Sequence, residues 1–143
     1  MEKRMCSGFS VIIVIAAALL LCPVFRAEAT ARYVTNGSDV PSNPVAGSFR
    51  SVLLSASAGD VIRFSGGGTT VVLADQVTID KALTIEGPAT IRQGATDKRV
   101  LEVSATCTMS NITITGGNFA NQGLSKLKGA GIYNRTAGIL TMN

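Results

Sequence analysis

The sequence predicts an all-β fold in which short strands coil into a solenoid, with one helix at its N-terminal end. First, a pattern of strand, polar bend, strand and glycine occurs twice, at Val77–Gly87 and at Cys107–Gly116. Second, aliphatic residues alternate with threonine in both copies, as in Leu83-Thr-Ile85, and successive side chains of a strand face opposite sides. Third, the segment before these strands has helical periodicity. Repeats of this length are typical of solenoids, in which each unit packs on its neighbours.

The two copies correspond at an offset of 30 residues in their first strands and 29 in their second strands. The matched positions are Val77 and Ile79 with Cys107 and Met109, and Leu83, Ile85 and Gly87 with Ile112, Ile114 and Gly116. A third copy begins at Leu140-Thr-Met142, offset 33 from Cys107. We expect matched aliphatic residues to stack inside the coil. The threonines are expected to face outward without forming rows in register; they are Thr78, Thr84, Thr113 and Thr115.

Residues 1–29 are predicted to be a cleaved signal peptide. Lys3 and Arg4 precede an uncharged run from Phe9 to Leu21, and Ala27-Glu-Ala29 supplies the small residues found before a cleavage site. The alternative is a membrane anchor, but this run is shorter than the roughly 20 apolar residues that a spanning helix needs. The sequence therefore predicts an exported protein with no transmembrane span in the mature chain.

The composition excludes several classes of protein. Cys6 and Cys22 lie in the predicted signal peptide, so Cys107 cannot belong to a disulfide framework, and its inward position predicts a small buried side chain rather than a reactive thiol. The net charge is +4, and the basic residues are scattered without interleaved aromatic residues. We therefore expect no nucleic-acid partner.

Residues 30–59 are predicted to be a lead-in segment followed by the N-terminal cap helix. Arg32-Tyr-Val34 is expected to form a short strand, and the turn residues Asn36–Pro44 prevent a helix from starting there. Ser48 is the expected N-cap, Gly59 the expected end, and the apolar face consists of Phe49, Val52, Leu53 and Ala56. Such a helix would cover the apolar cross-section and the free strand edges of the first coil.

Residues 60–143 are predicted to form the rungs of the coil. The strands expected besides the two copies are Val61–Phe64, Thr70–Leu73, Thr90–Ile91, Val100–Val103, Gly129–Asn134 and Ile139–Met142. Gly66–Gly68 is expected to be a flexible corner, because it lacks the lysine of a phosphate loop and precedes a strand. The segment Asn118–Lys128 is expected to leave the coil as a longer excursion.

Four motifs resemble the N-terminal region of bacterial right-handed parallel β-helix surface proteins, the pectin-lyase-like, polymorphic outer-membrane and adhesin-type repeat family. The motifs are Gly47–Arg50 running to Gly59–Phe64, Leu83–Pro88, Ile112–Gly117 and Gly129–Asn134. The resemblance implies a right-handed parallel β-helix, and members of this family continue for many more rungs. We therefore expect this chain to be a truncated, N-terminal piece with an uncapped C-terminal end.

The residues offer little for catalysis. The chain has no histidine, and each mature carboxylate is expected to be a solvated turn residue paired with Lys81 or Arg92; the seven are Asp39, Asp60, Asp75, Asp80, Glu86, Asp97 and Glu102. A small acidic patch of Asp75, Asp80 and Glu86 near Arg92 is the alternative, and Asp60 is expected to lead out of the helix. We therefore predict no catalytic, cofactor-binding or metal-binding residues, and no cofactor.

The leading functional hypothesis is a non-enzymatic, exported scaffold, the N-terminal part of an extracellular or outer-membrane, adhesin-like protein. Its expected partners are surface glycans or proteins of host or neighbouring cells, and end-to-end self-association through the uncapped C-terminal rung is a further expected contact. The alternative is the N-terminal part of a polysaccharide lyase or glycoside hydrolase whose active site lies beyond residue 143. An ice-binding threonine face is disfavoured because the threonines are not expected to align.

Overall fold

The computed structural model describes residues 28–66, 69–119 and 129–143. Most of the predicted signal peptide lies outside the described residues, as do Gly67, Gly68 and residues 120–128 of the predicted excursion. The described chain forms nine strands and one short helix, so the all-β prediction is confirmed. The elements are β1 (Ala31–Val34), α2 (Phe49–Ser55), β2 (Val61–Phe64), β3 (Thr69–Leu73), β4 (Val77–Ile79), β5 (Leu83–Gln93), β6 (Leu101–Val103), β7 (Thr106–Thr115), β8 (Ile132–Asn134) and β9 (Ile139–Met142).

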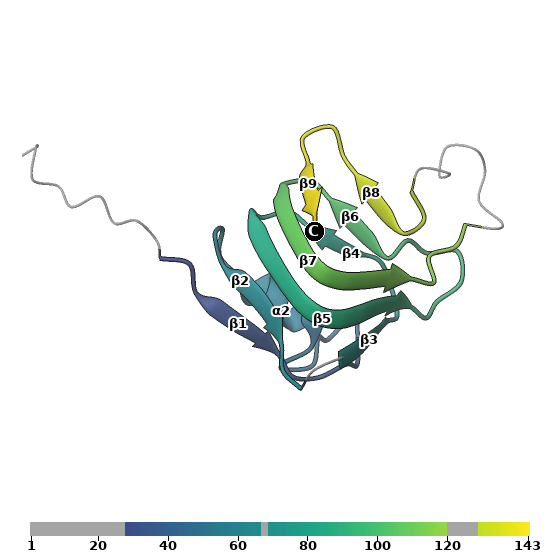
Figure 1. Ribbon diagram of the computed structural model, residues 1–143. Coiled ribbons are helices and arrows are strands. Elements are labelled where there is room, and N and C mark those ends of the chain that lie inside the picture. The colour runs from purple at the N-terminus through teal and green to yellow at the C-terminus, as the bar shows by residue number, and fades with distance from the viewer. Residues whose placement is uncertain (1–27, 67–68, 120–128) are drawn as a thin grey trace, which may run out of the picture.

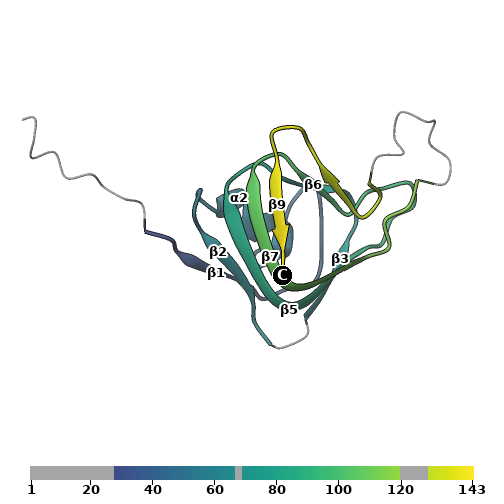
Figure 2. The ribbon, with the colours of Figure 1, turned by 45° about the horizontal axis from the view of Figure 1, so that its top comes forward.

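The strands form two parallel sheets. The larger sheet has the order β1-β2-β5-β7-β9, and β3 pairs with the second half of β5, while the smaller sheet has the order β4-β6-β8. Both views show β5 and β7 as long curved strands lying side by side, with β1 and β2 on one side of them and β9 on the other (Figures 1 and 2). β5 bends along its length (Figure 1), and its register with β7 shifts between Glu86 and Ala89, where the Gly87–Pro88 peptide bond is cis. It pairs with β2 before the bend and with β3 after it.

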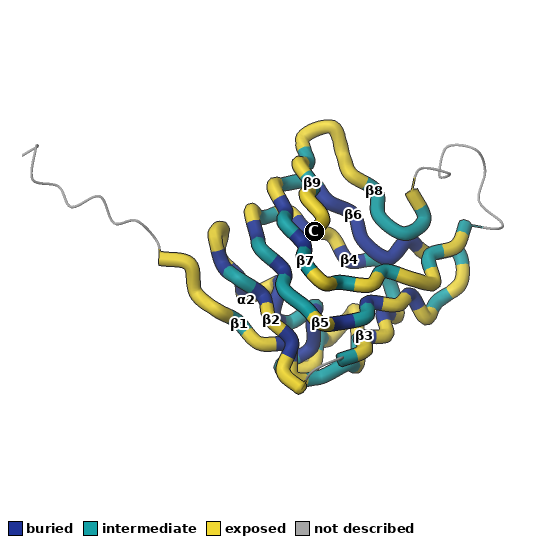
Figure 3. The backbone as a smooth tube through the Cα atoms, in the orientation of Figure 1, coloured by how far each residue is buried: buried dark blue, intermediate teal, exposed yellow. Residues whose placement is uncertain are grey.

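Aliphatic side chains stack between the two sheets because the strand pairing is in register. Ile62 is the partner of Ile85, Ile85 is the partner of Met109, and all three are buried. The same holds for Val71 beside Ile91. Buried and more exposed positions therefore alternate along β5 (Figure 3). Removing apolar surface from water stabilises the fold by about 25 cal/mol per Å².

Helix α2 begins as predicted but ends early. Ser48 is extended, and its side chain accepts a hydrogen bond from the Ser51 amide, which confirms it as the N-cap. The helix ends at Ser55 rather than near Gly59, because Ala56 is extended and buried in the core. Gly59 instead has φ +93° in the turn before β2, where its amide donates to the carbonyl of Ala82 over 2.7 Å.

The predicted correspondence between the two sequence copies is wrong as a guide to stacking. Leu83 pairs with Cys107 and Val77 pairs with Leu101, so the real offset between these neighbours is 24 residues. The motifs Leu83-Thr-Ile85 and Ile112-Thr-Ile114 look alike in sequence. The first lies in the half of β5 before the bend, whereas the second lies in the half of β7 after it. The predicted third copy is confirmed, because Leu140 and Met142 pair with Cys107 and Met109.

Candidate functional site

Threonine side chains form aligned rows on the outward face of the larger sheet, contrary to the prediction that they would not align. Thr84, Thr108 and Thr141 are successive partners across β5, β7 and β9. A second row crosses β3, β5 and β7 and consists of Thr70, Thr90 and Thr113. The rows escaped sequence analysis because they follow the true offsets of the strands. Threonine is common in strands in any case, because its β-branched side chain fits a pleated, half-buried surface.

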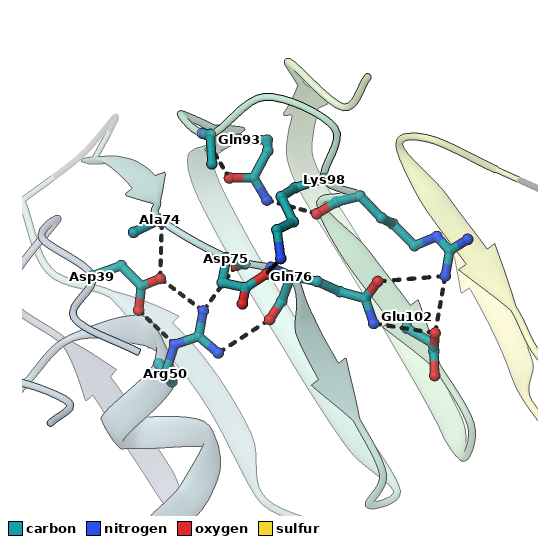
Figure 4. A network of polar contacts seen from close by, with 10 residues as sticks. Asp39, Arg50, Ala74, Asp75, Gln76, Gln93, Lys98 and Glu102 are labelled. Carbon is teal, nitrogen blue, oxygen red and sulfur yellow. Dashed lines mark hydrogen bonds and ion pairs between the residues drawn. The ribbon is translucent and has the colours of Figure 1, made fainter. Parts of the chain in front are cut away.

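The densest set of polar contacts lies where β3 passes into β4, and we call it the charged seam. It consists of Asp39, Arg50, Asp75, Gln76, Lys98, Arg99 and Glu102. Figure 4 shows the labelled members of this network reaching from helix α2 across β4 to β6. The seam joins segments that are distant in sequence. We take it as the candidate functional site, because it gathers several carboxylates and basic groups of the described residues into one network.

Arg50 connects helix α2 to the first end of the seam. Its Nε and Nη2 donate to the two carboxylate oxygens of Asp39 over 2.6 and 2.7 Å. The same guanidinium donates to the carbonyls of Asp75 and Gln76 over 2.8 and 3.1 Å. The amide of Ala74 completes the contacts of Asp39 at 3.0 Å. One arginine therefore fixes the helix, the turn that carries Asp39 and the corner before β4 together.

Glu102 is the centre of the other end of the seam. Its outward position in β6 is covered, since only 8% of the side chain is exposed. Its carboxylate accepts from Arg99 at 2.9 Å, from Arg135 at 2.5 Å and from Gln76 at 3.1 Å. The Arg99 guanidinium also lies over the ring of Tyr133, 4.5 Å from its centroid, a favourable cation–π geometry. These contacts connect β6 to the segment around β8.

The pKa values of two seam carboxylates, Asp39 and Asp75, are lowered. Partial burial would raise the pKa of Asp39, but hydrogen bonds from Arg50 and the Ala74 amide outweigh it and hold the pKa below 3.8. The ammonium group of Lys98, 2.9 Å from Asp75, lowers the pKa of that carboxyl as well. A general acid at neutral pH needs a raised pKa. Asp39 and Asp75 therefore lack the raised pKa that a general acid needs.

A groove of about 250 Å³ lies between helix α2 and β4. Leu53 and Leu54 line it from the helix, and the segment Gln76–Lys81 lines it from the sheet. The Lys81 ammonium donates to the carbonyls of Leu53, Leu54 and Ala56 over 3.2, 2.9 and 2.9 Å. The two basic residues that line the groove, Arg50 and Lys81, therefore donate their hydrogen bonds to protein groups.

The structure pairs the predicted carboxylates differently from the sequence-based expectation. Lys81 binds helix carbonyls, and Glu86 pairs with Arg63 at 2.8 Å, so neither shows the predicted pairing. In the alternative acidic patch, Asp75 pairs with Lys98. Asp60 does lie in the turn after the helix, but it is buried rather than solvated.

Sequence reasoning missed the pairs Asp39–Arg50 and Glu102–Arg99. The first joins a proline-rich turn to a helix, and no local pattern marks that contact. The second had a signal, because Glu102 interrupts the apolar run from Val100 to Val103. A carboxylate at such a position is expected to have a partner when it is covered.

Cys107 is fully buried in the core, as predicted. Burial raises the pKa of its thiol to about 11. The nucleophilic form of cysteine is the thiolate, so the thiol stays protonated and inert at neutral pH.

Comparison with models of known protein families, with curated proteins and with solved structures yields no match. Among the described residues, no group of three or more His, Cys, Asp or Glu side chains is arranged to hold a metal ion. No helix in the described part of the chain is long and apolar enough to cross a membrane.

Proposed function

We propose that the chain is the N-terminal part of an exported, non-enzymatic scaffold built as a right-handed parallel β-helix, secreted or displayed on the cell surface. One observation carries the proposal: β2, β5, β7 and β9 are parallel neighbours whose inward aliphatic residues stack in register. A coil that adds one such layer per turn is stabilised by contacts between neighbouring turns. It presents outward side chains as regular rows, which suits a protein whose task is display.

The contacts of the carboxylates support a scaffold over an enzyme. Among the described residues, five carboxylates form ion pairs with arginine or lysine, namely Asp39, Asp60, Asp75, Glu86 and Glu102. Polysaccharide cleavage by paired carboxyl groups needs one of them protonated near the working pH. The lowered pKa values of Asp39, Asp60 and Asp75 oppose that role.

Purified secreted protein tests the non-enzymatic part of the proposal. We expect incubation with acidic and neutral polysaccharides to leave their chain length and their number of reducing ends unchanged. Immobilised glycans and cell-surface extracts from candidate host or neighbouring cells then test for the proposed partners. Sustained shortening of any polysaccharide would contradict the scaffold proposal and favour the carbohydrate-active alternative.

Export is tested with the full chain expressed in a host that has a secretory pathway. We expect the mature protein outside the cytoplasm and a precursor in the cytoplasm when Ile13→Arg interrupts the apolar run. Arginine in the centre of that run opposes membrane insertion, whereas Ser7→Arg, before the run, is the matched control. Equal export of all three chains would contradict the predicted leader.

Contact between two copies of the chain is proposed at the edge formed by β8 and β9. Ile139 and Met142 are 62% and 51% exposed there, beside the partly buried Leu140. Exposed apolar strand edges pair readily with other chains. Light scattering after size exclusion should show association that Ile139→Lys reduces, while Leu54→Lys, at a residue 66% exposed on α2, leaves it unchanged. A strictly monomeric parent protein would rule this contact out.

A further inference from the structure

Asp60 is a buried carboxylate at the start of β2. Its residue is 2% exposed, although it lies in the turn between helix α2 and the sheet. One carboxylate oxygen, Oδ2, accepts from the amide of Ser57 over 2.9 Å and from the guanidinium of Arg32. Arg32 is the charged side chain that contacts Asp60 among the described residues. These contacts occupy one oxygen and connect the turn to β1.

The other oxygen of Asp60 contacts the backbone nitrogen of Thr30. The distance from this nitrogen to Oδ1 is 3.1 Å. Thr30 directly follows Ala29, which is the last residue of the predicted signal peptide. Glu28, Ala29 and Thr30 are all exposed, so the peptide bond between Ala29 and Thr30 lies on the surface beside a buried anion.

We propose that hydrolysis of the Ala29–Thr30 bond creates an α-ammonium group that forms an ion pair with Asp60 and fastens β1 to the turn before β2. The inference rests on the proposed export of the chain with removal of its leader. Water is consumed in the cleavage, Ala29 leaves with a new carboxylate, and the nitrogen of Thr30 becomes a charged amine. A neutral amide hydrogen bond thereby becomes a charge-assisted one at the same position, and charge-assisted bonds are roughly twice as strong.

The arrangement fits a carboxylate that must stay ionised. Hydrogen bonds from Arg32 and from the amide of Ser57 outweigh burial and lower the pKa of Asp60 to about 2. The anion and the charged amine are therefore present together from above about pH 2 up to the pKa of the amine. The fixed pair would also explain why Thr30, an exposed residue ahead of the first strand, is held by a residue 30 positions away.

The test uses the full chain with a protease recognition sequence inserted between Ala29 and Thr30, placed so that cleavage leaves Thr30 as the first residue. Urea unfolding is measured before and after cleavage in the parent chain, in Asp60→Asn and in Glu86→Gln. Glu86 pairs with Arg63 on the surface, so its variant is the matched control. We expect cleavage to raise the midpoint by roughly 0.5 M in the parent and in Glu86→Gln, but not in Asp60→Asn. An equal midpoint before and after cleavage in the parent overturns the proposal.

A second readout does not depend on the folding of Asp60→Asn. The pKa of the Thr30 α-amino group is measured by NMR in the cleaved parent chain. Pairing with a buried carboxylate should raise it by about one unit above the usual range near 8, whereas an unshifted value overturns the proposal. A raised pKa means that the stabilisation is present below pH 8 and is lost as the pH rises through the new value.

The first residue of protein exported from the unmodified chain separates this proposal from the proposed function. Thr30 as the first residue supports both, and another first residue overturns the Thr30–Asp60 pair while leaving export intact. Failure of export contradicts the proposed function and removes the natural source of the amine, while the inserted protease site still tests whether that amine pairs with Asp60.

Discussion

Ile85 shows how strongly a single inward residue of this fold is constrained. It is fully buried between Ile62 and Met109. We expect Ile85→Ala to lower the free energy of unfolding by about 2–5 kcal/mol, because it removes buried methyl groups and leaves a cavity. Ile114 is only partly buried, so Ile114→Ala should cost less than half as much. Urea denaturation of both variants measures the difference, and equal losses would contradict the assigned burial.

Asp60 should also set part of the acid stability of the fold. Its pKa is about 2 in the folded chain against an ordinary 3.8, so it favours the folded state above pH 3.8. This contribution is lost as the pH falls from 3.8 towards 2, because the unfolded chain binds a proton first. Asp60→Asn should flatten the decline in thermal stability across that window, while Asp80→Asn, at an exposed residue, should leave it in place. A decline unchanged in Asp60→Asn would contradict the lowered pKa.

Sequence patterns predicted individual residues well where the cause is local. Cys107 and Ser48 behave as predicted, because alternation sets the facing of Cys107 and N-cap chemistry depends on neighbours in the chain. The Asp39–Arg50 pair could not be predicted, because it depends on how the turn that carries Asp39 packs against helix α2. Glu102 had a local signal, but its contacts with Gln76 and Arg135 depend on the offsets between strands, and those offsets vary along the chain.

At the scale of elements, helix α2 is held at its C-terminal end by a side chain from outside the helix. The Lys81 ammonium donates to the carbonyls of Leu53, Leu54 and Ala56 at this end, and a cation near a helix C-terminus interacts favourably with the helix dipole. Lys81→Met keeps the aliphatic stem but should lower the free energy of unfolding by about 1–2 kcal/mol. Hydrogen exchange should quicken most within Phe49–Ser55.

Lys98→Met is the control for that prediction. Lys98 pairs with Asp75 where both side chains are more than 40% exposed, and exposed pairs contribute about 0–1 kcal/mol. Its loss should therefore leave exchange in the helix unchanged. Equal effects of Lys81→Met and Lys98→Met would contradict the capping role of Lys81.

Element types were predictable from the sequence, but their pairing was not. The period of two in Val61–Phe64 and the period of 3.6 before it identified strand and helix directly. β5 is one long strand whose first half pairs with β2 and whose second half pairs with β3. Nothing in the local pattern separates that arrangement from two strands in successive turns, so the predicted offsets of 30 and 29 differ from the observed 24.

At the scale of the whole molecule, the succession of parallel strands determines how the fold responds to mechanical load. β1 and β9 lie at opposite edges of the larger sheet, so a pull applied at residues 30 and 143 falls first on the outermost strands. Each of these is held by a single neighbour. We expect the chain to lengthen in several small steps in an optical trap, as one strand after another separates from the sheet. A single abrupt extension would show that the strands separate together. A protein built this way can lose an outer layer under tension and leave the layers beneath it intact.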